Sequence, residues 1–222
     1  MRYQNNIVKK PWGYEYLAYE NNECALWFLH INKDQKTSMH CHPNKTTGLV
    51  LLQGEAVVSF LNDDNTMRPI NKIMIRKGLF HSTKAVSESG ADIFEIETPV
   101  DKYDLVRLKD SYGREGKPYE DSSHDMPKQE ECLWIENPGK GEENTYLTSN
   151  TRLVVKNILS VDELQTVSDS TNIMFLQGGV VTQYGINVAG AGDVVAGKVL
   201  KQLTKVFTAV KENTIIMIME KQ

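Results

Sequence analysis

The chain has 222 residues, of which 40% are hydrophobic and 24% are charged, a composition typical of a folded globular protein and unlike a disordered one. Its formal net charge of -4 gives no support for a nucleic-acid partner, which usually requires a basic face. No apolar run approaches the ~20 residues of a membrane span and no signal-peptide pattern is present, so we expect no membrane partner.

The first half of the chain predicts a series of short β-strands separated by polar turns. Each expected strand is short and apolar or alternating, and almost no helical periodicity occurs. Residues 10–17 are expected to form a turn leading into a strand, and further strands are expected at residues 24–31, 48–52, 55–61, 72–75 and 93–98. Short strands at this regular spacing favour an all-β sandwich or barrel, which we place in residues 1–116.

The composition changes after Lys109 to a stretch rich in Gly, Pro and charged residues. We expect residues 117–150 to form a connecting region that lies over a surface. His124 falls in this region and is expected to be a solvated loop residue.

The last third of the chain, residues 151–222, is a weak echo of the first. An apolar strand ends in Gln177-Gly178, as another does in Gln53-Gly54, and two later strands follow at matching spacing. Near-equal spacing of these landmarks indicates a repeated module, and we expect a second, degenerate barrel. This copy has no histidine. One short helix is expected at 162–165, capped by Ser160.

Two histidines in the first copy, His40 and His42, stand two residues apart on an expected strand. Side chains two apart on a strand point to the same face, so both imidazoles would project together. Neutral imidazoles are good ligands for zinc and similar ions, but a pair is only part of a site. His81, three residues after a turn glycine, supplies a third candidate ligand.

These two motifs, His-x-His before a strand and Gly-x-x-His after a later hairpin, resemble those of the cupin superfamily. The resemblance implies two β-barrel or jelly-roll domains in tandem, a bicupin. It also implies a divalent metal held by His40, His42 and His81, with zinc the first expectation and iron, manganese, cobalt or nickel as alternatives. Thr47 stands where the family has a glutamate ligand, so we expect the fourth ligand to be absent or supplied by another group.

The flanks of residues 8–116 resemble the cupin domain of type II phosphomannose isomerases. The entry Lys10-Pro-Trp-Gly-Tyr14 is similar to that domain's Arg-Pro-Trp-Gly, and Phe94–Thr98 is similar to a strand near its end. The segment from Asp104 to Arg114 is similar to its closing Asp-Ile-Val-Arg and Asp-x-Tyr-Gly-Arg motifs. The resemblance implies an isomerase or epimerase for a sugar phosphate or nucleotide-linked sugar, in carbohydrate or polysaccharide precursor metabolism.

Such a reaction needs a base and an oxyanion-stabilising group. Glu95 and Glu97 share one strand face and are candidate catalytic bases, although a solvated outer face is the alternative. Arg107 and Arg114 are candidates to bind the substrate by bidentate hydrogen bonds, or else to tie the barrel's exit segment to its surface through salt bridges.

Two other functions stay open at this point. A three-histidine site with open positions also suits an Fe(II)-dependent dioxygenase, and a non-catalytic sugar-binding or assembly protein could use the same fold. The terminal apolar strand would suit a homodimer interface. Three cysteines without Cys-x-x-Cys spacing favour free thiols and a cytoplasmic location.

Overall fold

The computed structural model describes residues 6–114 and 127–222. The chain divides into two compact units, the first made of Met1–Glu20 and Ala25–Trp134 and the second of Asn21–Cys24 and Ile135–Gln222. In the described residues, no helix is long and apolar enough to cross a membrane. The expected connecting region, residues 117–150, lies partly outside the described residues, and His124 lies outside them. The described part of this region includes a strand of the second unit, residues 143–147.

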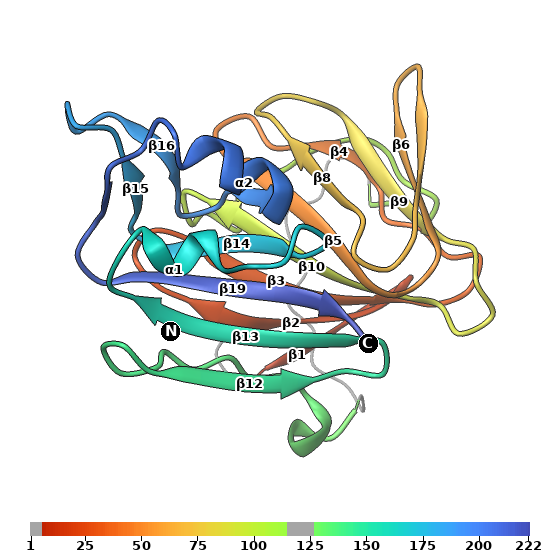
Figure 1. Cartoon of the computed structure of the whole chain (residues 1–222). Helices are drawn as coiled ribbons and strands as arrows, with labels where there is room; N and C mark the ends of the chain where they lie inside the picture. The colour runs from red at the N-terminus through yellow and green to blue at the C-terminus, as the bar shows by residue number, and fades with distance from the viewer. Residues whose placement is uncertain (1–5, 115–126) are drawn as a thin grey trace. The chain divides into compact units, whose positions relative to one another are not determined.

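The first unit is built from short antiparallel strands, as the sequence predicts (Figure 1). Its strands are β1 (Ile7–Lys10), β2 (Gly13–Glu20), β3 (Ala25–Ile31), β4 (Met39–Cys41), β5 (Thr46–Gly54), β6 (Ala56–Phe60), β7 (Asp64–Met67), β8 (Lys72–Ile75), β9 (His81–Ala85), β10 (Ala91–Thr98) and β11 (Val106–Lys109), and a 3₁₀ turn, η1, spans Gln129–Glu131. One sheet has the order β1-β2-β3-β10-β5-β8 and the other β11-β4-β9-β6-β7.

The eight strands from β3 to β10 follow a jelly-roll path. Successive strands cross from one sheet to the other except at the β6–β7 hairpin. Counted from β3, one sheet reads first, eighth, third, sixth, and the other reads second, seventh, fourth, fifth. Two such sheets built from nested hairpins form a jelly roll. The predicted all-β fold is confirmed for this unit.

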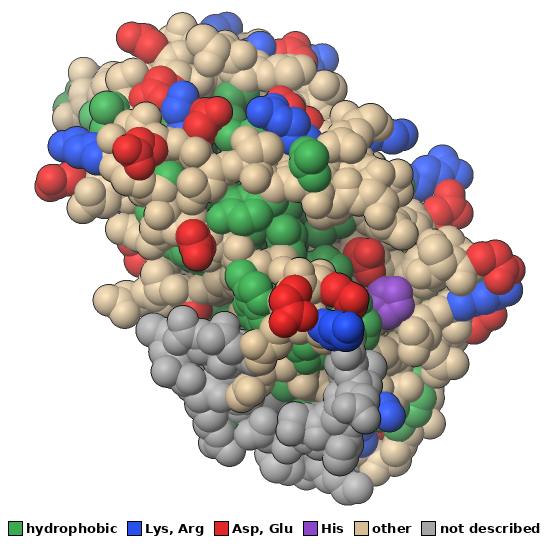
Figure 2. Space-filling view, turned by 90° about the horizontal axis from the view of Figure 1, so that it is seen from below, with side chains coloured by type: hydrophobic (Ala, Val, Ile, Leu, Met, Phe, Trp, Pro, Cys, Tyr) green, Lys and Arg blue, Asp and Glu red, His purple; other side chains and the backbone are tan. Residues whose placement is uncertain are grey.

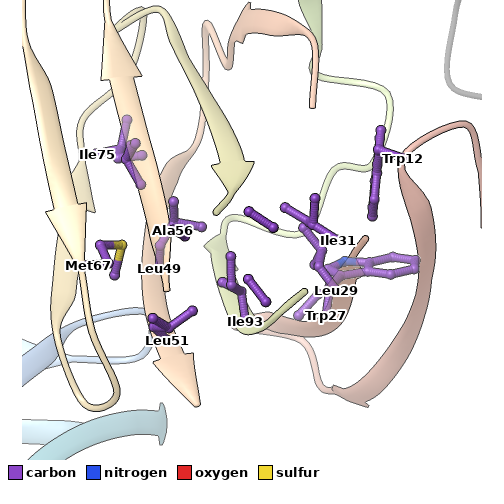
Figure 3. Close-up of a cluster of buried hydrophobic side chains, with 14 of the residues drawn as sticks. Trp12, Trp27, Leu29, Ile31, Leu49, Leu51, Ala56, Met67, Ile75 and Ile93 are labelled. Atoms are coloured by element: carbon purple, nitrogen blue, oxygen red, sulfur yellow. The ribbon is translucent and has the colours of Figure 1, made fainter. Parts of the chain in front are cut away.

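The core of the first unit fills the space within the jelly roll (Figure 3). Every second residue of β3, β5 and β10 points inward because side chains alternate along a strand. The inward residues include Trp27, Leu29, Ile31, Leu49, Leu51 and Ile93, all at most 4% exposed. Glu95 and Glu97 continue the alternation of Ile93 along β10, so their side chains also point inward. The solvated outer face considered for them is therefore wrong.

The second unit also consists of two antiparallel sheets. Its elements are β12 (Glu143–Leu147), β13 (Thr151–Ile158), α1 (Asp162–Gln165), β14 (Asn172–Gln177), β15 (Gly179–Val181), β16 (Asn187–Gly190), β17 (Val194–Ala196), α2 (Gly197–Leu203), β18 (Ala209–Val210) and β19 (Thr214–Lys221). The strand orders are β12-β13-β19-β14-β17 and β16-β15-β18. The short helix is present at the expected residues, but Ser160 does not cap it: the N-cap is Val161, without a side-chain cap hydrogen bond. The Ser160 amide donates to Oε1 of Glu163.

The strand order of the second unit repeats that of the first. The run β13-β19-β14-β17 corresponds to β3-β10-β5-β8, and β18-β15-β16 corresponds to β9-β6-β7. The two Gln-Gly turns also match, since Gly54 and Gly178 both have positive φ, at 83° and 68°. A Cβ at either glycine would lie within 2.5 Å of another atom, so both turns require glycine.

The two copies differ at one strand. Between the first and third strands of the path, the first unit has β4, whereas the second unit has the helix α1. Among the described residues, the second unit has no counterpart of β4 in its sheets. Since β4 carries His40, the second copy has lost both the histidines and the strand that would hold one of them.

Candidate metal centre

Three histidines converge inside the first unit. His40 lies on β4, His42 follows that strand, and His81 opens β9, where it pairs directly with His40. One ligand atom from each imidazole lies within 4.8 Å of those of the other two. His42 and His81, which have 38 residues between them in the sequence, therefore meet in space. This triad could bind a metal ion, as the sequence predicts.

A backbone carbonyl fixes the orientation of each imidazole. Nδ1 of His40 lies 2.7 Å from the carbonyl oxygen of Ser38, and Nδ1 of His42 lies 2.7 Å from that of Asp104. Nδ1 of His81 lies 3.0 Å from the carbonyl oxygen of Leu79. A carbonyl only accepts, so each Nδ1 carries the proton and each Nε2 keeps its lone pair. Metal-binding histidines are commonly oriented in this way.

Burial keeps all three imidazoles neutral. It lowers the pKa of His40 well below its usual range, with the neighbouring His81 and His42 adding to the effect. Burial, followed by the charge of Lys45, lowers the pKa of His42 to about 3, and burial also lowers the pKa of His81. Neutral imidazole is the form that coordinates a metal.

The Nε2 atom of His42 is buried and has no hydrogen-bond partner among the described residues. Buried polar atoms are nearly always satisfied, so an orphaned one indicates a missing ion or water. A metal ion held at the point where the ligand atoms of the three histidines come together would satisfy it. The donor set thus fits a divalent metal such as zinc, iron, manganese, cobalt or nickel.

The position of the expected glutamate ligand is filled by Thr47, which is fully buried on β5. Its hydroxyl oxygen has no hydrogen-bond partner among the described residues. A carboxylate approaches the triad from a different strand: Oε1 of Glu95, on β10, lies 3.8 Å from Nε2 of His42. Burial raises the pKa of Glu95 to about 7, although Lys102 and Lys45 act in the opposite direction.

Glu97 lies two residues further along β10 but is held differently. It forms an ion pair with Lys45, and both side chains are 2% exposed. The indole Nε1 of Trp27 also donates to Glu97 Oε1 over 2.9 Å, and Lys45 donates to the carbonyl of Asp101 over 2.9 Å. These contacts fix Glu97 in place, whereas the carboxyl group of Glu95 faces the triad.

The two candidate arginines both line the cavity beside the triad. Arg107 lies on β11, where it pairs with His40. The Arg114 side chain donates to Asp110 twice, from Nη2 to Oδ1 over 2.6 Å and from Nε to Oδ2 over 3.0 Å, and its backbone amide donates to Oδ2 over 2.8 Å. This salt bridge joins two residues of the exit segment itself, and so it is not a tie between that segment and the barrel surface.

The cavity has a volume of about 60 Å³ and a strongly charged lining. Its charged residues are Lys10, Lys45, Lys102, Arg107, Arg114, Glu15, Glu95 and Glu97. The sequence alone assigned no role to Lys10, Lys45 or Glu15. Glu15 could have been recognised as a site residue, because it is a charged residue within the otherwise apolar and aromatic strand β2. Buried charges are rare without a partner.

Asp104 is a further residue that the sequence interpretation did not assign to the site. Its carboxylate accepts hydrogen bonds from the amides of Asn44 and Lys45 over 2.8 and 3.0 Å, and from the Asn44 side chain over 2.9 Å. Its carbonyl orients His42. Asp104 thus holds both the second histidine and the loop that follows it.

No family model matches the chain, and no curated protein matches it. Solved structures resemble part of it. KdgF from Halomonas sp. is 11% identical, with 43% of this chain and 89% of that chain covered at a TM-score of 0.41. A conserved protein with a double-stranded β-helix domain from Klebsiella pneumoniae is 13% identical, with coverages of 46% and 91% and a TM-score of 0.42.

A sugar phosphate isomerase of the cupin superfamily from Silicibacter pomeroyi is 12% identical, with 39% of this chain and 59% of that chain covered at a TM-score of 0.37. At such identities and scores, the likeness carries no information about function. The fold is instead decided by the strand order and by the position of the triad within the jelly roll. The fold is that of a cupin.

Proposed function

We propose that the first unit is a metal-dependent isomerase or epimerase that acts on a phosphorylated or nucleotide-linked sugar. The observation that carries the proposal is the convergence of three neutral imidazoles beside the carboxyl group of Glu95, within a cavity lined by cations. The similarity of residues 8–116 to phosphomannose isomerase cupin domains supports the choice of substrate class.

In this proposal, the histidines bind the metal and Glu95 transfers the proton. His40, His42 and His81 would hold the metal, which when bound would polarise the substrate's oxygen atoms. Glu95 would take a proton from one carbon and return it to the neighbouring carbon, because its carboxyl group lies in the cavity beside His42. Glu97 would keep Lys45 and Trp27 in place and not exchange a proton with substrate.

The test is an NMR assay of mannose 6-phosphate and related sugar phosphates, with and without added zinc, manganese, cobalt or nickel. We expect metal-dependent interconversion by the wild type and none by His81→Gln. His30→Gln is the matched control, because His30 lies outside the triad with its Nδ1 2.6 Å from Asp92. Unchanged spectra for every substrate and metal would contradict the proposal.

An Fe(II)-dependent dioxygenase is the second candidate, since the triad consists of three neutral histidines with no carboxylate among them. Oxygen uptake by the iron-loaded protein with a small thiol or diketone, in the absence of sugar-phosphate turnover, would favour it. Sugar-phosphate binding without any turnover would instead favour a non-catalytic binding protein.

A further inference from the structure

Lys45 is the most deeply buried cation among the described residues that line the cavity, with 2% of its surface exposed. It lies immediately before β5, in the loop that follows His42, and its backbone amide donates to the Asp104 carboxylate over 3.0 Å. Burying an ammonium group is costly unless its charge is paired and its hydrogens find acceptors. The partners of this ammonium therefore indicate what it can still bind.

The ammonium of Lys45 has two partners in the part of the chain that the structure describes. It forms a buried ion pair with Glu97 and donates to the carbonyl oxygen of Asp101 over 2.9 Å. Because Glu97 compensates its charge, the burial of Lys45 requires no further anion. An ammonium has three N–H donors, and these two acceptors take two of them. The third donor is left for a group that enters the cavity.

The charge of Lys45 acts on three groups of the site. Burial, followed by this charge, lowers the pKa of His42, and burial and Lys45 also lower the pKa of His81. Burial raises the pKa of Glu95, and Lys102 and Lys45 oppose that effect. Electrostatic effects weaken with distance, so Lys45 lies close to the point where His42 and Glu95 face each other over 3.8 Å.

The proposed isomerisation places negative charge on a substrate oxygen. Glu95 takes the proton from the hydroxyl-bearing carbon, the electrons of that C–H bond form a C=C bond, and the carbonyl electrons move onto oxygen. The hydroxyl proton then passes to this oxyanion, and Glu95 returns its proton to the former carbonyl carbon. A fixed N–H donor stabilises such an oxyanion, because it does not have to reorient as the charge develops.

We propose that Lys45, held by Glu97 and by the Asp101 carbonyl, is a further catalytic residue that donates its third N–H to the substrate oxyanion. The oxyanion role rests on the proposed function, whereas a hydrogen bond from Lys45 to a ligand oxygen can be tested without turnover. The ammonium stays protonated throughout the reaction. Glu97 compensates the charge of Lys45 and fixes the direction of its donors.

The probe for this contact is acetohydroxamate, whose two neighbouring oxygen atoms resemble those of an enediolate. The cobalt-loaded full chain is titrated with it, and the visible spectrum of cobalt reports the binding. The decisive comparison is between Glu97→Gln, which keeps the ammonium, and Glu97→Gln combined with Lys45→Met, which leaves no unpaired charge. We expect the Kd of acetohydroxamate to be about tenfold to a hundredfold higher in the double variant, as for loss of a hydrogen bond to a charged group.

Lys84→Met is the matched control for the loss of a lysine. Lys84 pairs with Asp34 at the surface, with 43% of its side chain exposed, and the Kd of this variant should equal that of the wild type. Cobalt content and circular dichroism check the loading and folding of each variant. If the double variant does not fold, Lys45→Gln replaces Lys45→Met beside Glu97→Gln, and the same rise in Kd is expected.

Equal acetohydroxamate affinity in Glu97→Gln and in the double variant would overturn the proposal, as would a cobalt-loaded wild type that does not bind acetohydroxamate. Binding that depends on Lys45, without sugar isomerisation, would support the contact from Lys45 and refute only the proposed isomerase. Isomerisation together with binding that does not depend on Lys45 would refute only the role of Lys45.

Discussion

The carbonyl oxygen of Asp104 accepts a hydrogen bond from Nδ1 of His42 over 2.7 Å, while the Asp104 carboxylate holds the backbone amide of Lys45 over 3.0 Å. A single residue, distant in sequence, therefore orients one candidate metal ligand and fixes the loop behind it. Such outer contacts of metal ligands typically change metal affinity by about 10- to 100-fold when they are removed.

We expect Asp104→Ala to weaken zinc binding by about tenfold, because the loop from His42 to Lys45 loses its anchor while the three imidazoles remain. The measurement is competition for zinc against a chromophoric chelator. Asp92→Ala is the matched control, since Asp92 contacts His30 and not the triad. Wild-type zinc affinity in Asp104→Ala would show that the side-chain hydrogen bonds of Asp104 to Asn44 and Lys45 do not help to position His42.

Glu95→Gln separates metal binding from proton transfer. The amide keeps the size of the carboxyl group but cannot accept a proton, so turnover of sugar phosphate should fall at least about 10²-fold. Zinc binding should change little, because the three imidazoles form the donor set. Rates from the NMR assay and zinc content decide the outcome; full activity in Glu95→Gln would exclude this residue as the base.

The buried ion pair of Lys45 and Glu97 should behave as a unit. Lys45→Met leaves Glu97 as a buried charge without its partner, and we expect the free energy of unfolding to fall by about 3–5 kcal/mol. Lys45→Met combined with Glu97→Gln should lose less, because no charge is then left unpaired and the glutamine can still accept from Trp27.

Urea denaturation of wild type, the two single variants and the double variant gives the coupling energy of this pair. If the double variant loses the sum of the two single losses, the side chains act independently, and the ion pair does not explain their burial.

Much of the fold could be predicted from the sequence because strands, turns and their repetition leave local signals. The Gln-Gly turns at Gly54 and Gly178 identified equivalent hairpins in both units, and the structure places both glycines at positive φ. The replacement of β4 by α1 in the second unit could not be predicted as the loss of a strand, because the four residues of α1 carry no signal for the sheet position that is missing.

The site was predictable only where residue types are distinctive. His40, His42 and His81 follow a recognisable spacing, and the structure brings them together. Glu15 and Lys102 come from opposite ends of the unit's sequence, and only the folded barrel places them 3.1 Å apart. Which face of β10 lines the cavity also depended on register, since a shift of one residue would exchange Glu95 for Phe94.

Acidic and basic side chains are interspersed on the face that Figure 2 shows. In the first unit, charged side chains are instead concentrated within the cavity beside the triad, several of them almost fully buried. Because buried charges are retained at a cost in stability, their concentration there is more consistent with a ligand site than with a purely structural core.

The most direct test of the account is the metal content of the purified chain after incubation with zinc and removal of excess metal, measured by inductively coupled plasma mass spectrometry. The convergence of the three histidines, with the unpartnered Nε2 of His42 among the described residues, predicts one zinc ion per chain in the wild type and in His30→Gln, and loss of that ion in His42→Ala and His81→Ala. A wild type that retains no metal, or triad variants that retain as much as the wild type, would contradict the assignment of this site.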